Sequence, residues 1–158
     1  MDGLQRAYDQ RLSGLSPAAK EMAQRALDMM CQRALSRVTQ GELLARKQMV
    51  QEKIADSWIE LEQFRLLVLR TAWLIDKHND YKMVRKDISA VKAAMPKVLH
   101  DIASRALHLH GSLGVSTEMP FGRQVMASYY LALADGPTEV HKVQVARDVL
   151  GGYRADED

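Results

Sequence analysis

Cysteine is nearly absent from this sequence. Cys31 is the single cysteine among 158 residues, so no disulfide can form within the chain, and a reducing compartment is the natural expectation. Long apolar runs are also missing: no stretch approaches the length of a membrane span, and the N-terminal MDGLQRAYDQRL has no apolar core of signal-peptide length. We therefore predict a soluble, cytoplasmic protein without a membrane partner, and import into an organelle stays open.

An excess of charge of either sign is missing too. The 22 basic residues are offset by 20 acidic ones, which leaves a net charge of +2 and no basic run. Such a balance gives no support for a nucleic-acid partner. With 47% hydrophobic residues the chain has the composition of an ordinary globule, and its length suits one domain with a moderate core.

Runs of alternating apolar and polar residues, the signature of half-buried strands, are not found. Apolar residues recur instead every three to four positions, which is typical of amphipathic helices. Ser16-Pro17 is a helix-start signal, because the serine can accept a backbone N–H and the proline already has a helical φ. The apolar period then continues to Val38, and Gly41 follows as a stop signal.

A second helix is predicted from near Leu43 to the polar cluster at 76–80. Its apolar face carries Trp58 and Leu61, which we expect to be buried against the neighbouring helices. A third apolar period follows over 84–109. Pro96 interrupts that period, but an interior proline usually kinks a helix without necessarily ending it.

Two shorter helices are predicted at 121–133 and 137–150, and Gly151-Gly152 follows the second as a stop signal. The expected fold is all-α, an antiparallel helical bundle. Its predicted domain organisation is a lead-in at 1–16, the bundle at 17–150 and a tail at 151–158.

Two turns bracket the helix at 121–133. Gly111-Ser112-Leu113-Gly114 lies before it, and Asp135-Gly136-Pro137 lies after it. Both turns combine small or flexible residues. We expect the second turn to aim the Asp135 carboxylate toward the first, which makes the stretch 106–147 the candidate site.

This stretch resembles the C-terminal end of the acyl-CoA dehydrogenase family, the flavoproteins that desaturate fatty acyl thioesters between Cα and Cβ. The resemblance extends over roughly 23–150. The turn ALADGPTEVH is most similar to the subgroup typified by two large human members fused or related to kinase-like domains, in which Asp replaces the usual Glu. The matching pieces, in order, are Leu107 to Gly114, Glu118-Met119-Pro120, Phe121 to Leu133 and Asp135 to Glu139.

The resemblance implies that Asp135 is the base that removes the substrate's α-proton. A carboxylate suits this step, because a hydrogen-bonded thioester carbonyl acidifies the α-proton enough for a modest base in a dry pocket. Considered by itself, Asp135 could instead cap the helix that follows it.

The resemblance also implies FAD as cofactor. Arg37, Thr39 and Gln48 fall on a segment where family members contact the dinucleotide across a dimer interface, and the planar fork of an arginine suits a pyrophosphate. Gln40 replaces the aromatic residue of that segment. Apart from the resemblance, Arg37 would be a solvated residue near a helix end or would complement the helix dipole.

A second FAD segment is implied at His108, Gly111 and Ser112, where the family's Gly-rich backbone lies along the flavin nucleotide of the neighbouring subunit. The alternative is a glycine that ends a helix beside two incidental histidines. A metal site at His108 and His110 is not expected, because side chains two apart on a helix do not face each other and no acidic partner has ligand spacing.

The resemblance adds cofactor contacts at Pro137 and Glu139 and acyl-CoA contacts at Gly136 and Arg147, although Pro137 lacks the hydroxyl of the family's threonine. Two functions are predicted. The first is a C-terminal domain or split subunit of an acyl-CoA dehydrogenase, homo-oligomeric or completed by a partner chain that carries the N-terminal and β domains. The second is a helical interaction protein or an inactive remnant of that family.

Overall fold

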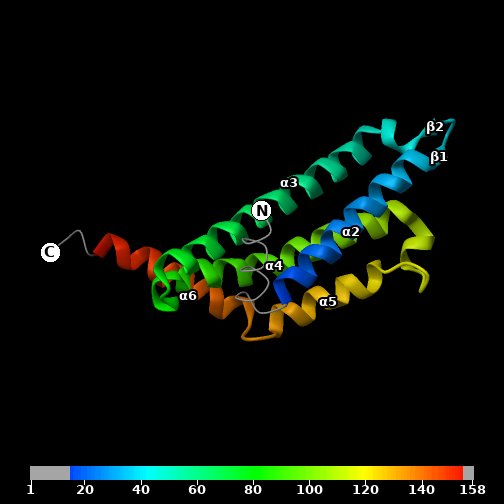
Figure 1. Cartoon of the computed structure of the whole chain (residues 1–158). Helices are drawn as coiled ribbons and strands as arrows, with labels where there is room; N and C mark the ends of the chain where they lie inside the picture. The colour runs from blue at the N-terminus through cyan, green and yellow to red at the C-terminus, as the bar shows by residue number, and fades with distance from the viewer. Residues whose placement is uncertain (1–14, 155–158) are drawn as a thin grey trace.

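The described residues, 15–154 of a computed structural model, form a bundle of long helices (Figure 1). They are α2 (Leu15–Ser36), α3 (Gln48–His78), α4 (Tyr81–His110), α5 (Phe121–Leu133) and α6 (Thr138–Arg154). Helix α4 is the centre of the bundle, because it packs against each of the other four. The predicted all-α helical bundle is therefore confirmed, while most of the predicted lead-in lies outside the described residues.

The core is built from complementary faces of α2 and α4. Small residues repeat along the buried side of α2 at Ala19, Ala23 and Ala26, each at most 2% exposed. They allow the backbone of α2 to approach α4 closely. The facing stripe of α4 consists of larger residues, among them Val91, Met95, Leu99 and Ile102, each at most 1% exposed. Small side chains opposite large ones fill the space between the helices without voids.

Helix α4 begins and ends at residues with clear capping roles. At its start the Asp80 carboxylate accepts a hydrogen bond from the Lys82 N–H at 2.9 Å. Pro96 lies inside α4 and is buried, and the helix continues past it as predicted. At the end Gly111 has a φ of 64°, a left-handed backbone that glycine adopts without steric cost.

A short hairpin joins α2 to α3 and is not foreseen by the sequence pattern. Strand β1 (Val38–Thr39) pairs antiparallel with β2 (Glu42–Leu43), and Gln40 and Gly41 between them both have positive φ. This is the turn geometry favoured by two-residue hairpins. A 3₁₀ turn, η1 (Leu44–Arg46), follows, so α3 begins at Gln48 and the predicted start near Leu43 is wrong. Strands of two residues are too short to produce an alternating pattern.

The prediction for the apolar face of α3 is half right. Leu61 is 2% exposed, as expected, but Trp58 is 59% exposed. The buried stripe passes through Ser57 instead, whose hydroxyl donates to the Lys53 carbonyl at 2.7 Å and accepts from Arg105 of α4 at 3.4 Å. Because consecutive helical residues are 100° apart, burying Ser57 turns Trp58 toward the outside.

Helix α6 runs through Gly151 and Gly152 to Arg154, so the predicted stop at these glycines is wrong. Each glycine weakens a helix by only about 1 kcal/mol relative to alanine. The backbone hydrogen bonds of the helix continue across the pair. The remaining residues of the predicted tail, 155–158, lie outside the described part of the chain.

Candidate functional site

The turn between α5 and α6 holds Asp135 in an unusual backbone conformation. Asp135 has a φ of 56° and Gly136 a φ of 103°, so two consecutive residues have positive φ. Glycine tolerates this region, whereas an L-residue with a side chain enters it only at a cost. The turn joins α5 to α6, which continues in the same general direction along α4 (Figure 1), and it presents the Asp135 side chain on the surface, where it is 61% exposed.

The Asp135 carboxylate is bound by a lysine from the central helix. Lys92 Nζ lies 2.9 Å from Asp135 Oδ2, and the lysine side chain is only 17% exposed. This hydrogen bond, together with the positive charge of Lys92, lowers the pKa of Asp135 below its ordinary value. The hydrogen bond of the carboxylate therefore goes to Lys92 on α4, which does not support the alternative of a cap for α6.

Three of the other residues predicted here, Gly136, Pro137 and Glu139, lie in the turn or at the start of α6, and Arg147 lies farther along α6. Gly136 is half-buried, while Pro137, Glu139 and Arg147 are exposed. Glu139 also lines a groove of about 310 Å³ between α4, α5 and α6. These positions leave Glu139 and Arg147 accessible to a bound molecule.

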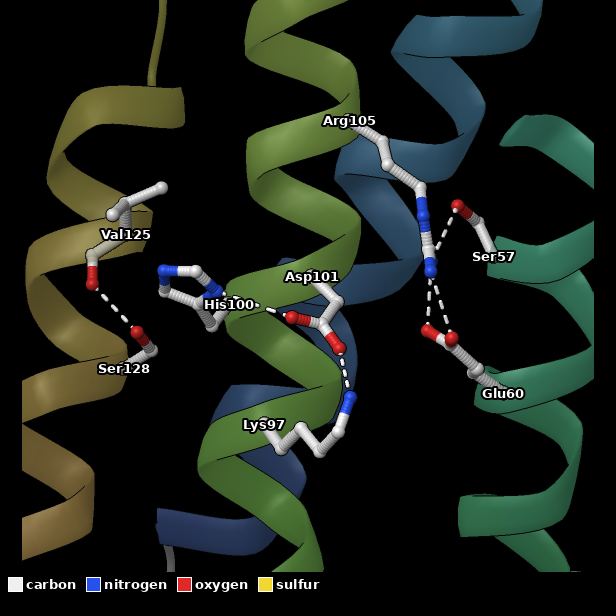
Figure 2. A network of polar contacts seen from close by, with 8 residues as sticks. All are labelled: Ser57, Glu60, Lys97, His100, Asp101, Arg105, Val125 and Ser128. Carbon is white, nitrogen blue, oxygen red and sulfur yellow. Dashed lines mark hydrogen bonds and ion pairs between the residues drawn. The ribbon is translucent and has the colours of Figure 1, made fainter. Parts of the chain in front are cut away.

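A polar network lies farther along α4, on the walls of neighbouring grooves (Figure 2). Arg105 donates to both carboxylate oxygens of Glu60 on α3, at 2.7 and 2.8 Å. Asp101 is held by Lys97 and by His100 Nδ1, the latter at 3.2 Å. Each charge in this network is paired within the bundle, so the network ties α3 to α4 and braces the middle of α4.

The first predicted cofactor segment lies at the far end of the bundle, at the hairpin. Arg37 precedes β1, Thr39 lies within it, and Gln48 is the first residue of α3. Arg37 and Gln48 are exposed and Thr39 is half-buried. Gln40, at the tip, accepts a hydrogen bond from Lys47 Nζ at 2.9 Å and so helps to hold the hairpin. The exposed arginine and amide leave this end open to an anionic ligand.

The second predicted cofactor segment, at the end of α4, lies at the same end of the bundle (Figure 1). His108, Gly111 and Ser112 are exposed there, at the start of η2 (Gly111–Val115). Gly114 is required by packing, since a Cβ at this position would lie 2.2 Å from the Leu107 carbonyl oxygen. The exposed backbone of Gly111 and Ser112 is thus held in place by a buried glycine behind it.

His110, in contrast, is part of the core. It is 7% exposed, its Nδ1–H donates to the Ala106 carbonyl at 2.8 Å, and its ring lies 4.7 Å from that of Phe121. Burial lowers the pKa of His110, the charge of Arg33 adds to this, and the hydrogen bond to Ala106 opposes both. His110 is therefore a neutral packing residue that points away from His108. No group of three or more His, Cys, Asp or Glu side chains in the described residues could hold a metal ion.

The two turns do not converge, so the expectation that Asp135 points toward Gly111–Gly114 is wrong. Asp135 contacts Lys92, which lies 19 residues before Gly111 on α4. At 1.5 Å per residue this corresponds to about 28 Å. Helix α5 lies between the two turns, so one turn lies at the end of the bundle near the hairpin and the other lies beside the middle of the molecule (Figure 1).

Comparison with known proteins identifies the family to which this helical bundle belongs. Residues 11–150 match the family model described as the acyl-CoA dehydrogenase C-terminal domain. The chain belongs to the acyl-CoA dehydrogenase family. A Mycobacterium tuberculosis protein named "Probable acyl-CoA dehydrogenase FadE2" is 40% identical over 128 residues, which cover 81% of this chain and 31% of that protein.

The subgroup indicated by the ALADGPTEVH turn is also among the relatives. Acyl-CoA dehydrogenase family member 11 of Rattus norvegicus is 40% identical over 126 residues, which cover 80% of this chain and 16% of that protein. The structure of butyryl-CoA dehydrogenase from Megasphaera elsdenii shares the fold with a TM-score of 0.80 at 22% identity, covering 93% of this chain and 37% of that one. The chain thus spans between 16% and 37% of the length of these proteins.

Sequence inspection missed Lys92, the residue that binds the carboxylate of Asp135. Lys92 is 43 positions before Asp135 and lies in an ordinary amphipathic stretch, with nothing local to distinguish it from its neighbours.

No helix among residues 15–154 is long and apolar enough to cross a membrane.

Proposed function

We propose that the chain acts as the C-terminal domain, or as a split subunit, of a flavin-dependent acyl-CoA dehydrogenase, with Asp135 as the base that removes the α-proton. One observation carries the proposal. Asp135, the residue that the resemblance assigns as the base, is held in a left-handed turn, exposed, and paired with a lysine that lowers its pKa. An ionised, accessible carboxylate is the form of the group that accepts a proton.

The reaction follows from what Asp135 can do. Removal of the α-proton breaks the Cα–H bond, places the proton on the carboxylate and leaves the electron pair to form the Cα=Cβ bond as hydride departs from Cβ. By resemblance, the backbone N–H of Asp135 donates to the thioester carbonyl and acidifies the α-proton. Gly136 lets a substrate approach this backbone closely, and Arg147 supplies a cation for acyl-CoA.

The residues at the hairpin end of the bundle suit a dinucleotide. They offer a guanidinium at Arg37, a hydroxyl at Thr39, an amide at Gln48 and an imidazole at His108, and the backbone at Gly111 and Ser112 is exposed. No side-chain partner occupies Arg37 within the described residues, so its fork is available for a pyrophosphate. FAD, when bound, supplies the acceptor for the hydride from Cβ.

The separation of the two regions supports a site shared between chains. Pro137 and Glu139 follow Asp135 at the start of α6, while Arg37 precedes β1 and His108 lies in the last turn of α4. One chain cannot place all of these residues around one flavin. We therefore propose a homo-oligomer in which each chain contributes its two separated regions to two sites, completed by a partner chain or by further domains.

A second candidate function is a helical interaction protein, or a catalytically inactive remnant of the family. Two departures at the predicted cofactor contacts favour it. Gln40 takes the place of an aromatic residue, and its side chain bonds to Lys47 within the hairpin. Pro137 has no hydroxyl to offer a cofactor.

Purification of the tagged chain from its source cells separates the two candidates. The first function predicts a larger partner that co-purifies, a flavin absorption spectrum and turnover of acyl-CoA with an artificial electron acceptor. Co-purified protein without flavin or turnover would support the interaction protein instead. A chain recovered alone carries no bound flavin under either function, so the assembly with a co-purified partner is the sample that decides: an assembly that binds neither FAD nor acyl-CoA would overturn the first function.

A further inference from the structure

Asp135 is held in its unfavourable conformation from two sides. A left-handed backbone at a residue with a side chain persists only where the surroundings favour it. Lys92 of α4 binds the carboxylate, and His141 Nε2 of α6 lies 3.3 Å from the Asp135 carbonyl oxygen, to which it donates when that nitrogen carries the proton. Gly136 packs against the same imidazole, since a Cβ there would lie 3.5 Å from His141 Nε2. The turn is therefore clamped between two helices.

The two oxygens of the carboxylate have different surroundings. Oδ2 accepts the hydrogen bond from Lys92, and no described residue donates to Oδ1. Lys92 is only 17% exposed although its partner is 61% exposed, so the lysine reaches the turn from within the bundle. A proton acceptor is thus left free on the accessible side, while the other oxygen is anchored.

The neighbouring charged residues do not bind the Asp135 carboxylate in place of Lys92. Lys97, the next cation along α4, pairs with Asp101. Glu139 and Lys142 of α6 line the adjacent groove, and neither bonds to Asp135. Within residues 15–154, the charges that act on the carboxylate of Asp135 are those of Lys92 and, when protonated, His141.

We propose that Lys92 is a positioning residue for Asp135: it anchors Oδ2 and leaves Oδ1 free to accept the proton. The proposal rests on the proposed role of Asp135 as the base. Lys92 does not touch substrate in this scheme. Its removal should release the carboxylate and raise the pKa of Asp135 without removing the base.

The first test is a ¹³C NMR titration of the side-chain carboxyl groups in the full chain, which requires neither flavin nor partner. The Asp135 signal is assigned by its loss in Asp135→Asn. Lys92→Met removes the charge and keeps the aliphatic stem, and Lys92→Arg restores a cation. Lys97→Met is the matched control, because it removes a lysine from the same helix whose partner is Asp101.

In Lys92→Met the pKa of Asp135 should shift upward relative to the wild-type chain, and Lys92→Arg should reverse most of that shift. Lys97→Met should leave Asp135 unchanged and affect Asp101 instead. An Asp135 midpoint that is the same in Lys92→Met and in the wild type would overturn the proposal. Circular dichroism verifies the helical content of each variant, and Lys92→Gln replaces Lys92→Met if the latter does not fold.

The second test uses an assembly that turns over acyl-CoA, if Asp135 proves to be its base. The acid limb of the pH profile should then move to higher pH in Lys92→Met and return in Lys92→Arg. An unmoved limb would remove the positioning role while leaving Asp135 as the base. Conversely, a shifted NMR midpoint together with an assembled complex that shows no turnover of acyl-CoA would confirm the contact and refute only the proposed function.

Discussion

At the residue scale, two titratable side chains lie in unusual surroundings, one in the turn between α5 and α6 and one in the core. Asp135 is a carboxylate with positive φ on the surface, and His110 is an imidazole inside the core. Both have a pKa below the ordinary value, but for opposite reasons. A nearby cation stabilises the charged form of Asp135, whereas burial destabilises the charged form of His110.

Replacing the proposed base tests its role directly. In an assembly that turns over acyl-CoA, Asp135→Asn should lower the rate by about a hundred- to ten-thousand-fold, because an amide cannot accept the α-proton. Binding of substrate should change little. Asp148→Asn is the matched control, since it makes the same change on α6 at a residue that pairs with Gln144. Unaltered turnover in Asp135→Asn would assign proton abstraction to another group.

Burial of His110 predicts a specific dependence of stability on pH. Its pKa is lowered in the folded chain, so below the ordinary value of 6.5 the unfolded chain binds a proton more readily than the folded one. The free energy of unfolding should therefore fall as the pH drops below that value, and His110 should contribute no further pH dependence above it. Urea unfolding between acidic and neutral pH measures this.

His110→Asn should flatten that part of the pH dependence, because asparagine does not titrate. His108→Asn is the control, as it removes an exposed histidine two residues earlier. Equal slopes in the wild type and in His110→Asn would show that the charge of His110 is not linked to folding.

At the element scale, α3 shows how a helix can be apolar on two faces. Its inner face buries Leu61, Phe64 and Val68, each at most 3% exposed. Its outer face carries Trp58, Leu66 and Trp73, each at least 50% exposed. The apolar period in the sequence therefore fits either face of α3, and only its packing against α4 shows which face is buried.

The two faces of α3 should respond differently to truncation. Leu61→Ala should lower the free energy of unfolding by about 2–5 kcal/mol, because it leaves a cavity in the core. Trp58→Ala should cost less than about 1 kcal/mol, as expected for an exposed site. Urea unfolding of both variants makes the comparison. A larger loss for Trp58→Ala would mean that the outer face is covered, for instance by association.

At the scale of the whole molecule, the isolated chain should self-associate and remain colourless. Its predicted cofactor residues lie in two places far apart along the bundle, and α3 exposes a row of large apolar side chains. Exposed apolar patches favour association. We expect a homodimer or tetramer in sedimentation at micromolar concentration, without the absorption of bound flavin.

Leu66→Glu should weaken that association if the outer face of α3 takes part in it, whereas Gln63→Glu, at the margin of that face, should have a smaller effect. A strictly monomeric chain would contradict the expectation that the exposed apolar face of α3 drives association. Tightly bound flavin in the isolated chain would show that a single bundle can form a flavin site without a second chain.

The local pattern of this sequence determined the helices and much of their extent, because helix periodicity and capping depend on residues within a few positions of each other. The boundaries of α5 and the passage of α4 across Pro96 are examples. The resemblance likewise placed Asp135 in the turn before α6. Only the tertiary structure decided that Trp58 faces outward, that Lys92 binds Asp135 and that Asp135 lies far from Gly111. These relations depend on how each helix is rotated and paired within the bundle, and that is set by close packing between side chains distant in the sequence.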